Sequence, residues 1–584
     1  MLIGAITVLA RITGFAKQYA FAQTVGTNCL ATAYMTANQI PNIVFEVVVG
    51  GALAGMVVPV LAGAAARRAP DGPARGGAPD GPSEAGPAQA GGPDGSAGLA
   101  GAPDGPMGVG SAQAGGSAGL ADASAQADGQ DAARVSWISS ALLTWVIVVL
   151  VPVGVLTALF AGPIVGVFFG SAIDGCTDVG AVTAVAARML VVFAPQIPLY
   201  GVAVVLYGVL QAHKRFAGPA VAPLVSSIVV IVAYLLFVPL SGGVTDPAAV
   251  PGPAELALSV GTSLGVLSLV LAVLGPLTRL GLRWRPVLRF PDGAAAHVRR
   301  LALAGIAALL AQQAAMIVVL VLSNNAIGNG AIAVYNYAWA IYLVPYAVLA
   351  VPIATSAFPR LSAQAGDPAG FAALTARTTR AVVLVSGLAA GVLAAASGPG
   401  AVVFLGMKSD VPAPELARAI ALFAPGLIGY GLIAHLSRVL YAAGRGRAAA
   451  TGTVAGWVVV MVAQAAFVAV LPEGWQIGGM ALGMSVGMSV GGALLLGSVT
   501  RARGRAAAAG LLRALCAAVA GGLLGYLAGG AVVGWLAAQG LWPNVGAAAL
   551  AAAVALAAGG VVVAMVDRAD AGAVAGLLRR SGRS

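Results

Sequence analysis

The chain has 584 residues, of which 59% are hydrophobic and only 9% are charged, and its mean hydropathy is +0.93. Soluble globular domains carry about 25% charged residues, so this composition excludes an ordinary soluble enzyme or binding domain. The formal net charge of +11 comes from cations that lie mostly between apolar runs. This distribution indicates membrane topology, and it requires no nucleic-acid partner.

Apolar runs long enough to cross a membrane occur along the whole chain. A hydrocarbon core of about 30 Å needs roughly 20 helical residues. The sequence therefore predicts an all-α integral membrane protein with 14 transmembrane helices. The predicted spans are 1–25, 29–62, 136–162, 179–212, 217–240, 254–278, 299–323, 329–358, 375–397, 412–441, 448–471, 475–499, 509–537 and 543–566.

Polar residues interrupt the first two predicted spans. Arg11 and Lys17 lie inside the first span, and a cation at bilayer depth costs about 3 kcal/mol unless it faces a bundle interior or a water-filled cavity. In the second span, Gln39, Asn42 and Glu46 share one helical face. We expect these residues to line a binding site. The structural alternatives are an Arg11–Glu46 ion pair and a Lys17 side chain that reaches the membrane surface.

Three arginines in later spans are further candidates. Arg188 and Arg418 are predicted near the outer ends of their spans, where anchoring of the helix is an equally valid role. Arg438 lies one turn after His435. The candidate substrate-binding set is therefore Arg11, Lys17, Gln39, Asn42, Glu46, Arg188, Arg418 and Arg438. The three cysteines and three histidines fit no metal spacing, so no metal site is expected. No cofactor and no catalytic residue are expected either.

The loops between the predicted spans alternate in charge. Even-numbered loops carry the arginines, whereas odd-numbered loops carry carboxylates and one cation, Lys408. Because positive loops stay in the cytoplasm, both termini are predicted inside the cell. Cys29 and Cys176 both fall on the predicted outer side, where they either form a disulfide or serve as small packing residues.

Residues 65–134 are a low-complexity segment of Ala-Pro-Asp-Gly units, glycine, serine and alanine. A segment with so few large apolar residues is predicted to be disordered, and it lies in a cytoplasmic loop. The predicted regions are 1–64 (spans 1–2), 65–134 (insert), 135–285 (spans 3–6), 299–505 (spans 7–12), 506–568 (spans 13–14) and 569–584 (cytoplasmic tail).

The chain repeats itself at long range. Residues 188–215 match residues 418–445 at an offset of 230, and Val58-Pro59 aligns with Phe358-Pro359 at an offset of 300. Six helices followed by six similar helices predict two lobes related by a pseudo-two-fold axis along the membrane normal, with two extra helices at the C-terminus. Such lobes are typical of transporters, whose site lies between them. The recurring residues include Phe193, Ala194, Pro195, Tyr200 and Gly201, which match Phe423, Ala424, Pro425, Tyr430 and Gly431.

Small residues and prolines predict how the helices pack and bend. Glycines at every fourth position of the twelfth span favour close helix packing over a phosphate loop, because no strand precedes them. These glycines are Gly479, Gly483, Gly487 and Gly491. The prolines expected to kink helices are Pro41, Pro195, Pro345 and Pro425.

Three segments resemble one family of membrane proteins. They are Leu9-Ala10-Arg11-Ile12-Thr13-Gly14-Phe15-Ala16-Lys17, Ile40-Pro41-Asn42 and Phe358-Pro359-Arg360-Leu361-Ser362. They resemble the MurJ/MviN family of lipid II flippases in the MOP exporter superfamily, and the arginine-, alanine- and glycine-rich composition resembles an actinobacterial member. The resemblance covers the chain except residues 65–134. It implies 14 helices in the bacterial cytoplasmic membrane. It also implies that the chain moves the peptidoglycan precursor lipid II to the outer leaflet by alternating access.

The resemblance carries roles onto individual residues. Arg11 and Lys17 match the first-span cations of the family's central cavity, which implies that they bind the substrate diphosphate, and Asn42 matches the Pro-Asn of the second span. The chain also departs from the family. Two arginines that often follow this Pro-Asn are replaced by Phe45-Glu46, and an arginine common in the eighth span is absent from Trp339-Ala340. The cavity is therefore expected to be less cationic than the family pattern.

The implied partners are lipid II and membrane lipids, with cell-wall synthases as further candidates and a monomeric state. Three alternatives stay open. The first is a flippase for another polyprenyl-linked oligosaccharide. The second is a multidrug or cation antiporter, which needs membrane carboxylates, and only Glu46 lies deep in an apolar run. The third is a membrane glycosyltransferase, which would be an enzyme and would need catalytic groups in a large outer loop.

Overall fold

A computed structural model describes residues 2–47, 117–213, 215–280, 284–288, 294–406 and 409–568, together with Asp570 and Gly572. In this part of the chain the regular elements are helices, and the one bridge of β type joins Ile173 to Cys176. The predicted all-α class is therefore confirmed for the described residues. Predictions for residues 48–116, including the second half of the second span, and for most of the tail lie outside them.

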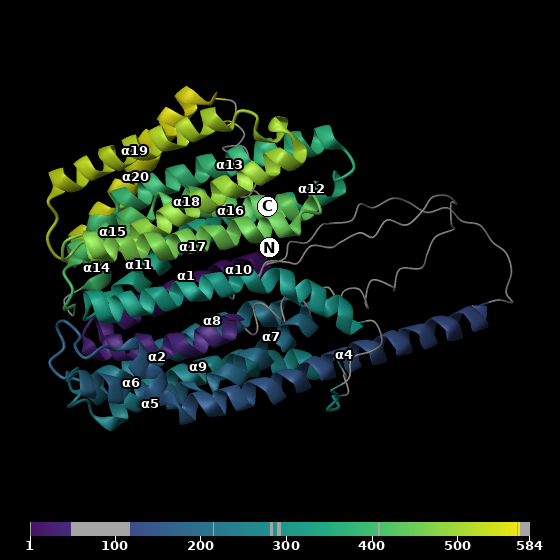
Figure 1. The fold of residues 1–584 in the computed structure, drawn as a ribbon, viewed down its shortest axis with the longest axis horizontal. Helices are drawn as coiled ribbons and strands as arrows, with labels where there is room; N and C mark the ends of the chain where they lie inside the picture. The colour runs from purple at the N-terminus through teal and green to yellow at the C-terminus, as the bar shows by residue number, and fades with distance from the viewer. Residues whose placement is uncertain are drawn as a thin grey trace.

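The first half of the chain forms one bundle of helices. They lie in the lower part of Figure 1 and run side by side along the long axis of the molecule. We call this group the first bundle. Its helices are α1 (Leu2–Thr24), α2 (Cys29–Phe45), α4 (Ser117–Leu159), α5 (Ala161–Phe168), α6 (Val179–Phe193), α7 (Gln196–Ala212), α8 (Ala217–Ser241) and α9 (Gly252–Thr278).

The second half forms a second bundle, which fills the upper part of Figure 1. Two C-terminal helices cover its far side, α19 (Leu511–Leu536) and α20 (Leu541–Val566). The other elements of the second bundle are α10 (Ala294–Leu322), η2 (Ser323–Ile327), α11 (Ala331–Pro345), η3 (Tyr346–Ala350), α12 (Val351–Ala363), α13 (Pro368–Ala395), α14 (Ser397–Leu405), α15 (Ala413–Phe423), α16 (Gly426–Ala442), α17 (Gly446–Val470), α18 (Gln476–Arg503) and η4 (Arg505–Ala508).

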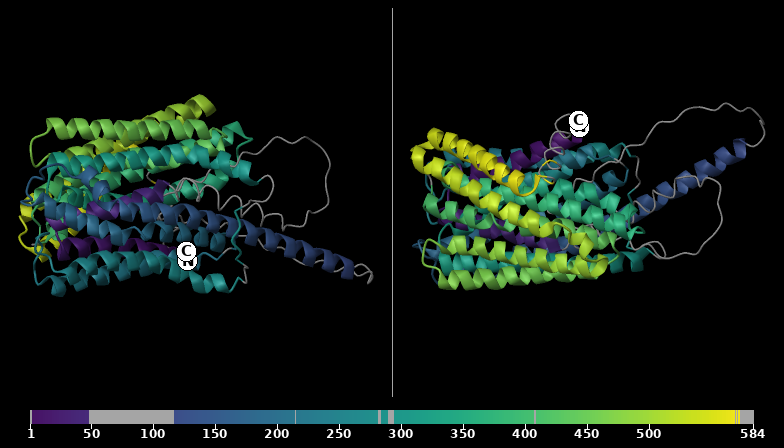
Figure 2. Two further views of the ribbon diagram at one scale, coloured as in Figure 1. Left: turned by 60° about the horizontal axis from the view of Figure 1, so that its bottom comes forward. Right: turned by 90° about the horizontal axis from the view of Figure 1, so that it is seen from above.

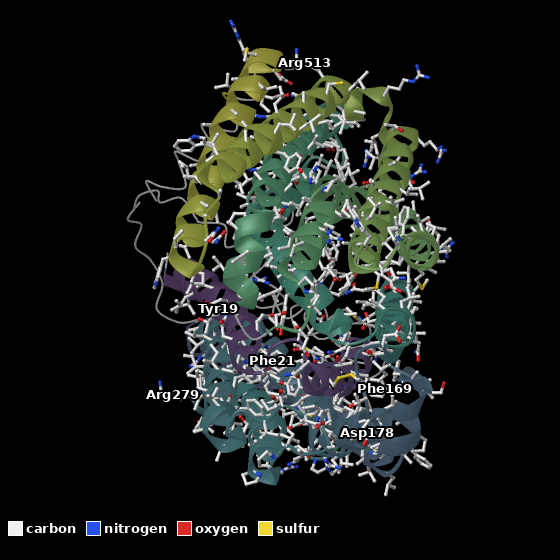
Figure 3. All side chains as sticks on the ribbon, turned by 90° about the vertical axis from the view of Figure 1, so that its left-hand side faces the viewer. Tyr19, Phe21, Phe169, Asp178, Arg279 and Arg513 are labelled. Carbon is white, nitrogen blue, oxygen red and sulfur yellow. A yellow bond between two sulfur atoms is a disulfide. The ribbon has the colours of Figure 1, made fainter. Side chains whose placement is uncertain are left out.

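Helix α1 lies where the two bundles meet. The end-on view of Figure 3 places its labelled residues Tyr19 and Phe21 between the two groups of helices. The Phe21 ring is fully buried and lies 4.8 Å from the ring of Tyr34 on α2. Tyr19 lies edge-on to Phe404 of the second bundle, with 5.7 Å between the ring centroids. The helix that carries Arg11 and Lys17 is therefore packed from both sides.

The structure differs from the expected disorder at one end of the insert. Helix α4 begins at Ser117 and has 43 residues, so residues 117–134 are helical. This stretch is rich in alanine, the residue with the highest helix propensity, and it contains no proline that would stop a helix. It continues the third span as one long helix, and both views of Figure 2 show α4 running beyond the ends of its neighbours.

Length and composition identify eleven described helices that are able to cross a membrane, or twelve if the bent pair α15–α16 is one span. Helices α1 and α2 are not among them: α2 has 17 residues, and α1 carries Arg11 and Lys17. The multi-pass membrane character of the chain is confirmed in this coarser form.

Two helices break at matching positions of the sequence repeat. α6 ends at Phe193 and α7 begins after Pro195, and α15 and α16 are separated in the same way around Pro425. The second break bends the chain by 43°. Proline lacks the amide hydrogen that continues a helix and clashes with the preceding turn, so the repeated Phe-Ala-Pro sequence accounts for both breaks.

The glycine stripe of α18 packs against α17, as predicted. A Cβ atom on Gly487 would lie 2.6 Å from the backbone nitrogen of Val460, and one on Gly483 would lie 2.6 Å from that of Gln464. Neither position has room for a side chain, because the two helix backbones approach each other closely.

Candidate substrate site between the two helix bundles

Arg11 connects the first bundle to the second. Its side chain projects from the middle of α1, is half-buried, and lies within electrostatic range of the Tyr346 hydroxyl in η3. Tyr346 is the first residue of a π-helical turn that follows Pro345. Single π turns are frequent at functional sites, where they reorient a side chain relative to the regular helix.

A second guanidinium approaches the same tyrosine from the other bundle. Arg438 on α16 is also within electrostatic range of Tyr346, and its Nη1 donates a 2.6 Å hydrogen bond to the Ala434 carbonyl of its own helix. The rings of Tyr346 and Tyr430 pack against each other, with 4.2 Å between their centroids. Cations from two different bundles therefore lie within electrostatic range of one tyrosine, Tyr346.

Glu46 lies beside two other aromatic groups. It follows directly after α2 and is within electrostatic range of Tyr200 on α7 and of Tyr430 on α16. It forms no ion pair with any described residue, so the structure does not contain the Arg11–Glu46 ion pair considered from the sequence. We call Arg11, Glu46, Tyr200, Tyr346, Tyr430 and Arg438 the central cluster.

Lys17 is a half-buried cation outside that cluster. It makes no ion pair and no side-chain hydrogen bond with another described residue. Because α1 is continuous through Gly14, Arg11 and Lys17 point about 120° apart around the helix. A partly buried ammonium group without a protein partner is costly, which makes Lys17 available to an anionic ligand.

Gln39 and Asn42, the other candidate residues of α2, are half-buried. The Asn42 side-chain amide donates a 3.0 Å hydrogen bond to the Asn38 carbonyl one turn earlier. Both residues lie on the helix that leads to Glu46.

The structure places Arg188 and Arg418 away from the central cluster. Arg188 forms a salt bridge with Glu255 at 2.7 Å and has 57% of its side chain exposed. Arg418 donates hydrogen bonds to the carbonyls of Pro414 and Gly474 and lies over the Trp475 ring at 4.9 Å. Both arginines precede the Phe-Ala-Pro break of their repeat, and both tie neighbouring helix ends together.

His435 is a packing residue of the second bundle. It is fully buried, and its Nε2 atom shares a 2.9 Å hydrogen bond with the Thr378 hydroxyl of α13. It therefore holds α16 against α13, one turn from Arg438. This contact fixes the helix face from which Arg438 projects.

Tyrosines are the part of the site that the sequence did not single out. Tyr200 and Tyr430 occupy equivalent positions of the repeat, and each lies near Glu46. Trp339 and Tyr342 extend this aromatic surface, because both lie 6.1 Å from Tyr430 between ring centroids. The recurrence of one tyrosine in both halves was the signal that could have identified it.

The arrangement is suited to binding a charged, polar ligand. Guanidinium groups and tyrosine hydroxyls donate hydrogen bonds to anionic oxygens, and aromatic rings stack on apolar faces. Among the residues that the structure describes, no three His, Cys, Asp or Glu side chains come together as a metal site.

Comparison with known structures defines the class of this fold. The structure is similar to that of a lipid II flippase MurJ in an inward closed conformation, with a TM-score of 0.66 and 15% sequence identity. The match covers 96% of this chain and 98% of that one. An inward-facing MATE transporter of the MOP superfamily gives a TM-score of 0.59 at 14% identity, with 85% of this chain and 95% of that one covered. An outward-facing MATE transporter gives 0.51 at 15% identity, covering 87% and 95%. The fold is thus that of MOP-superfamily transporters.

A sequence model of the family described as lipid II flippase MurJ matches residues 123–550. This match covers more than half of the chain. The chain belongs to the MurJ family of lipid II flippases, as its sequence resemblance predicted.

Proposed function

We propose that this chain carries lipid II from the cytoplasmic to the outer leaflet of the bacterial cytoplasmic membrane. Membership of the MurJ family supports this function. The structural observation that carries the proposal is that Arg11 and Arg438, from two different bundles, both lie within electrostatic range of Tyr346.

A lipid-linked headgroup needs such a site because its charges and polar groups have no partners in hydrocarbon. Arg11 and Arg438 are proposed to bind the diphosphate, since the planar guanidinium engages two phosphate oxygens at once. Lys17 is proposed as an additional contact along the path. Among these three, Arg438 is the cation proposed to compensate for the arginines that the chain lacks at Phe45-Glu46 and Trp339-Ala340.

The other polar groups are proposed to contact the rest of the headgroup. Tyr200 and Tyr430 offer hydroxyls and ring faces to sugars, and Glu46, which is within electrostatic range of both, offers an acceptor. Gln39 and Asn42 extend the polar surface of α2. We assign Arg188 and Arg418 to the anchoring of helix ends, because each is already engaged by protein groups.

We infer a 14-helix topology with both termini in the cytoplasm. Helices α1 and α2 are proposed to span the membrane together with the eleven or twelve helices identified by length and composition. The shared Phe-Ala-Pro breaks support two six-helix lobes related by a pseudo-two-fold axis. Rocking of one lobe against the other would expose the central cluster to each side in turn.

Depletion and complementation test the substrate. When the chain is depleted in its bacterial host, lipid II should accumulate in the cytoplasmic leaflet, and a plasmid copy of the wild-type gene should restore export. Accumulation of a different polyprenyl-linked oligosaccharide would contradict lipid II as the substrate. Unimpaired lipid II export together with loss of drug efflux would support the antiporter alternative instead.

A further inference from the structure

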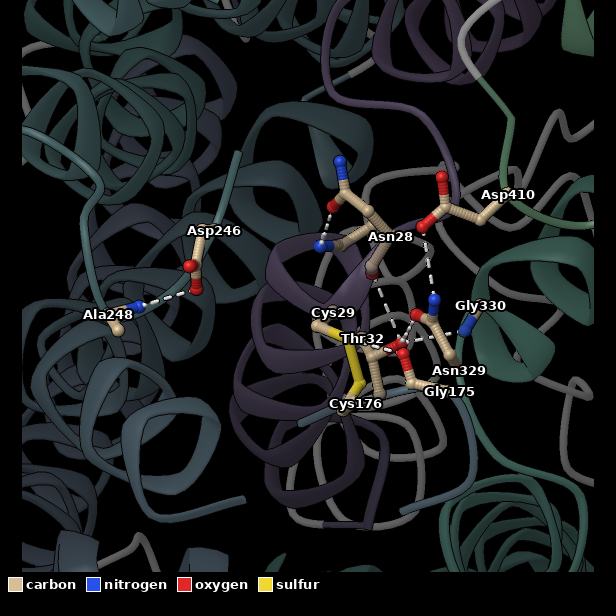
Figure 4. Close-up of a disulfide and its surroundings, with 11 residues drawn as sticks. Asn28, Cys29, Thr32, Gly175, Cys176, Asp246, Ala248, Asn329, Gly330 and Asp410 are labelled. Carbon is tan, nitrogen blue, oxygen red and sulfur yellow. Dashed lines mark hydrogen bonds between the residues drawn. A yellow bond between two sulfur atoms is a disulfide. The ribbon is translucent and has the colours of Figure 1, made fainter. Parts of the chain in front are cut away.

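Four loops meet at one end of the molecule, and all four are odd-numbered loops, which the alternation of charge predicts on the outer side. The first bundle contributes the loop before α2 and residues 169–178, which join α5 to α6. The second bundle contributes residues 328–330 and the residues before α15. Figure 4 shows this region from close range, with Asn329 and Asp410 beside a disulfide of the first bundle. We call the hydrogen-bonded contacts between these four loops the outer latch.

Asn329 is the central residue of the outer latch. Its backbone nitrogen donates a 2.7 Å hydrogen bond to the Asp174 carbonyl of the first bundle. Its side-chain amide donates a 3.1 Å hydrogen bond to the Asp410 carboxylate of the second bundle. The adjacent Gly330 nitrogen donates a 2.9 Å hydrogen bond to the Thr32 hydroxyl. One short segment of the second bundle therefore holds α2 and loop 169–178 of the first.

Thr27 makes the reciprocal contacts from the first bundle. Its hydroxyl accepts a 3.1 Å hydrogen bond from the Val411 nitrogen and shares a 2.8 Å hydrogen bond with the Ser409 hydroxyl. The two halves of the chain thus exchange similar contacts: the loop before α2 binds the loop before α15, and the loop before α11 binds the loop before α6.

Loop 169–178 presents its contacts on a tight turn. The Cys176 nitrogen donates a 3.0 Å hydrogen bond to the Ile173 carbonyl, and Gly175 between them has φ +82°. A positive φ at the third position of a four-residue turn is the geometry of a type II turn, which favours glycine. Asn325 contacts the helix end just before this loop. Its side-chain amide donates a 3.2 Å hydrogen bond to the carbonyl of Phe168, the last residue of α5.

A disulfide fixes this turn to the first bundle. Cys176, the last residue of the turn, is bonded to Cys29 at the start of α2, and the two Cα atoms are 5.9 Å apart across 147 residues of sequence. The sequence left this pairing open. Cys29 aligns with Asn329 at the repeat offset of 300. The α2 end of the disulfide in one half therefore corresponds to Asn329 in the other.

We propose that the Cys29–Cys176 disulfide keeps the Asp174 carbonyl of loop 169–178 within hydrogen-bonding distance of the Asn329 nitrogen. Closure of the outer side of the transporter then depends on the oxidised cysteine pair. Asn329 is then a positioning residue for the outer-closed state. A turn with Gly175 at its tip has many conformations when its end is not fixed, and a covalent cross-link removes most of them. The outer latch consists of contacts between protein groups, so this inference can fail or hold independently of the proposed function.

Hydrogen–deuterium exchange of the purified full-length chain tests the inference. Reduction by dithiothreitol converts the disulfide to two thiols while the reagent becomes a cyclic disulfide. We expect the amides of residues 328–332 to exchange at least about tenfold faster after reduction, because the Asn329 amide loses its fixed acceptor. The C29A/C176A double variant should show the same increase without any reductant.

Two controls separate this effect from general loosening. Amides in the glycine-packed pair α17–α18 should keep their exchange rates, and Asp246→Ala, which removes only a contact to Ala248 in an outer loop of the first bundle, should leave residues 328–332 unchanged. If the double variant does not fold, the reduced wild-type chain still gives the answer. Exchange at residues 328–332 that is equal in the oxidised and reduced chain would overturn the proposal.

Discussion

The cations at the periphery of this molecule and those near its centre have different surroundings. Arg188, Arg380 and Arg513 each contact a carboxylate, in salt bridges with Glu255, Asp570 and Asp567. In the central region, Arg11 and Arg438 face Tyr346, and Lys17 has no partner among the described residues. The chain thus pairs the cations that connect its helix ends with carboxylates, whereas Lys17 and Arg438 make no ion pair with a described residue.

The difference separates structural from functional charge. A buried cation without a carboxylate, such as Lys17, destabilises the protein alone and becomes favourable when an anion binds. The peripheral pairs stabilise the resting fold and need no ligand. Removing one peripheral cation and one central cation, and measuring both lipid II export and protein stability, tests this difference.

The largest effect is expected from Arg11. Arg11→Ala should abolish export of lipid II at normal expression, and Arg11→Lys should restore little of it, because an ammonium group loses the planar fork that matches phosphate oxygens. Complementation of a depleted strain, with quantification of lipid II in the outer leaflet, measures this. Growth and export at wild-type levels with Arg11→Ala would show that Arg11 does not bind the substrate.

A variant that combines Arg11→Ala with Glu46→Gln tests the role of Glu46. Since Glu46 makes no ion pair with the described residues, removing its charge releases no cation, and Glu46→Gln should not restore export to Arg11→Ala. Glu46→Gln alone should have a milder effect if the carboxylate only accepts hydrogen bonds from the headgroup, and a severe one if it carries a coupling proton. Recovery of export in the double variant would show that the two charges balance each other in another state of the protein.

The tail offers a pH-dependent test of the peripheral class. Burial opposes ionisation of Asp570, but the hydrogen bonds and charge of Arg380 outweigh it and hold the pKa of this carboxyl below its ordinary value. A lowered folded-state pKa stabilises the fold above the ordinary pKa of about 4 and ceases to do so as the pH falls through the folded value.

Thermal unfolding at different pH values measures this contribution. The wild-type melting temperature should fall more steeply than that of Asp570→Asn as the pH is lowered below about 4. The two curves should converge at the acid end, and Asp246→Asn should follow the wild type. Parallel curves for the wild type and Asp570→Asn would contradict a contribution of the Arg380–Asp570 pair to stability.

The smallest effect is expected from Arg188. The Arg188 side chain in its salt bridge with Glu255 is 57% exposed to solvent, so Arg188→Ala should cost only about 1 kcal/mol of unfolding free energy. Export should stay at the wild-type level, because the residue lies outside the central cluster. Loss of export in a stable Arg188→Ala variant would place this arginine on the transport path after all.

Local sequence signals predicted most of the fold. Apolar runs located the helices, the Phe-Ala-Pro repeat located two matching breaks, and the glycines of α18 located its contact with α17, because each of these depends on neighbouring residues in the chain. The helical residues 117–134 were missed because low complexity was given more weight than the helix propensity of alanine.

The site was only partly predictable, since it depends on residues far apart in the chain. Arg11, Glu46 and Arg438 stood out as charges in apolar runs. Their convergence on Tyr346 and Tyr430 depends on the packing of α1 against the second bundle and on the π turn after Pro345, which single-sequence patterns do not reveal. The Glu255 partner of Arg188 lies 67 residues away, and no spacing rule connects them.

Binding of a short-chain polyprenyl diphosphate to the purified chain tests the shared diphosphate site most directly. Charge-assisted hydrogen bonds contribute about 1.5–3 kcal/mol, so Arg438→Ala should weaken binding at least about tenfold. Arg188→Ala, the matched peripheral control, should bind like the wild type. If Arg438→Ala binds the diphosphate as tightly as Arg188→Ala does, the two bundles do not share the substrate at Tyr346, and the central cluster is not the diphosphate site.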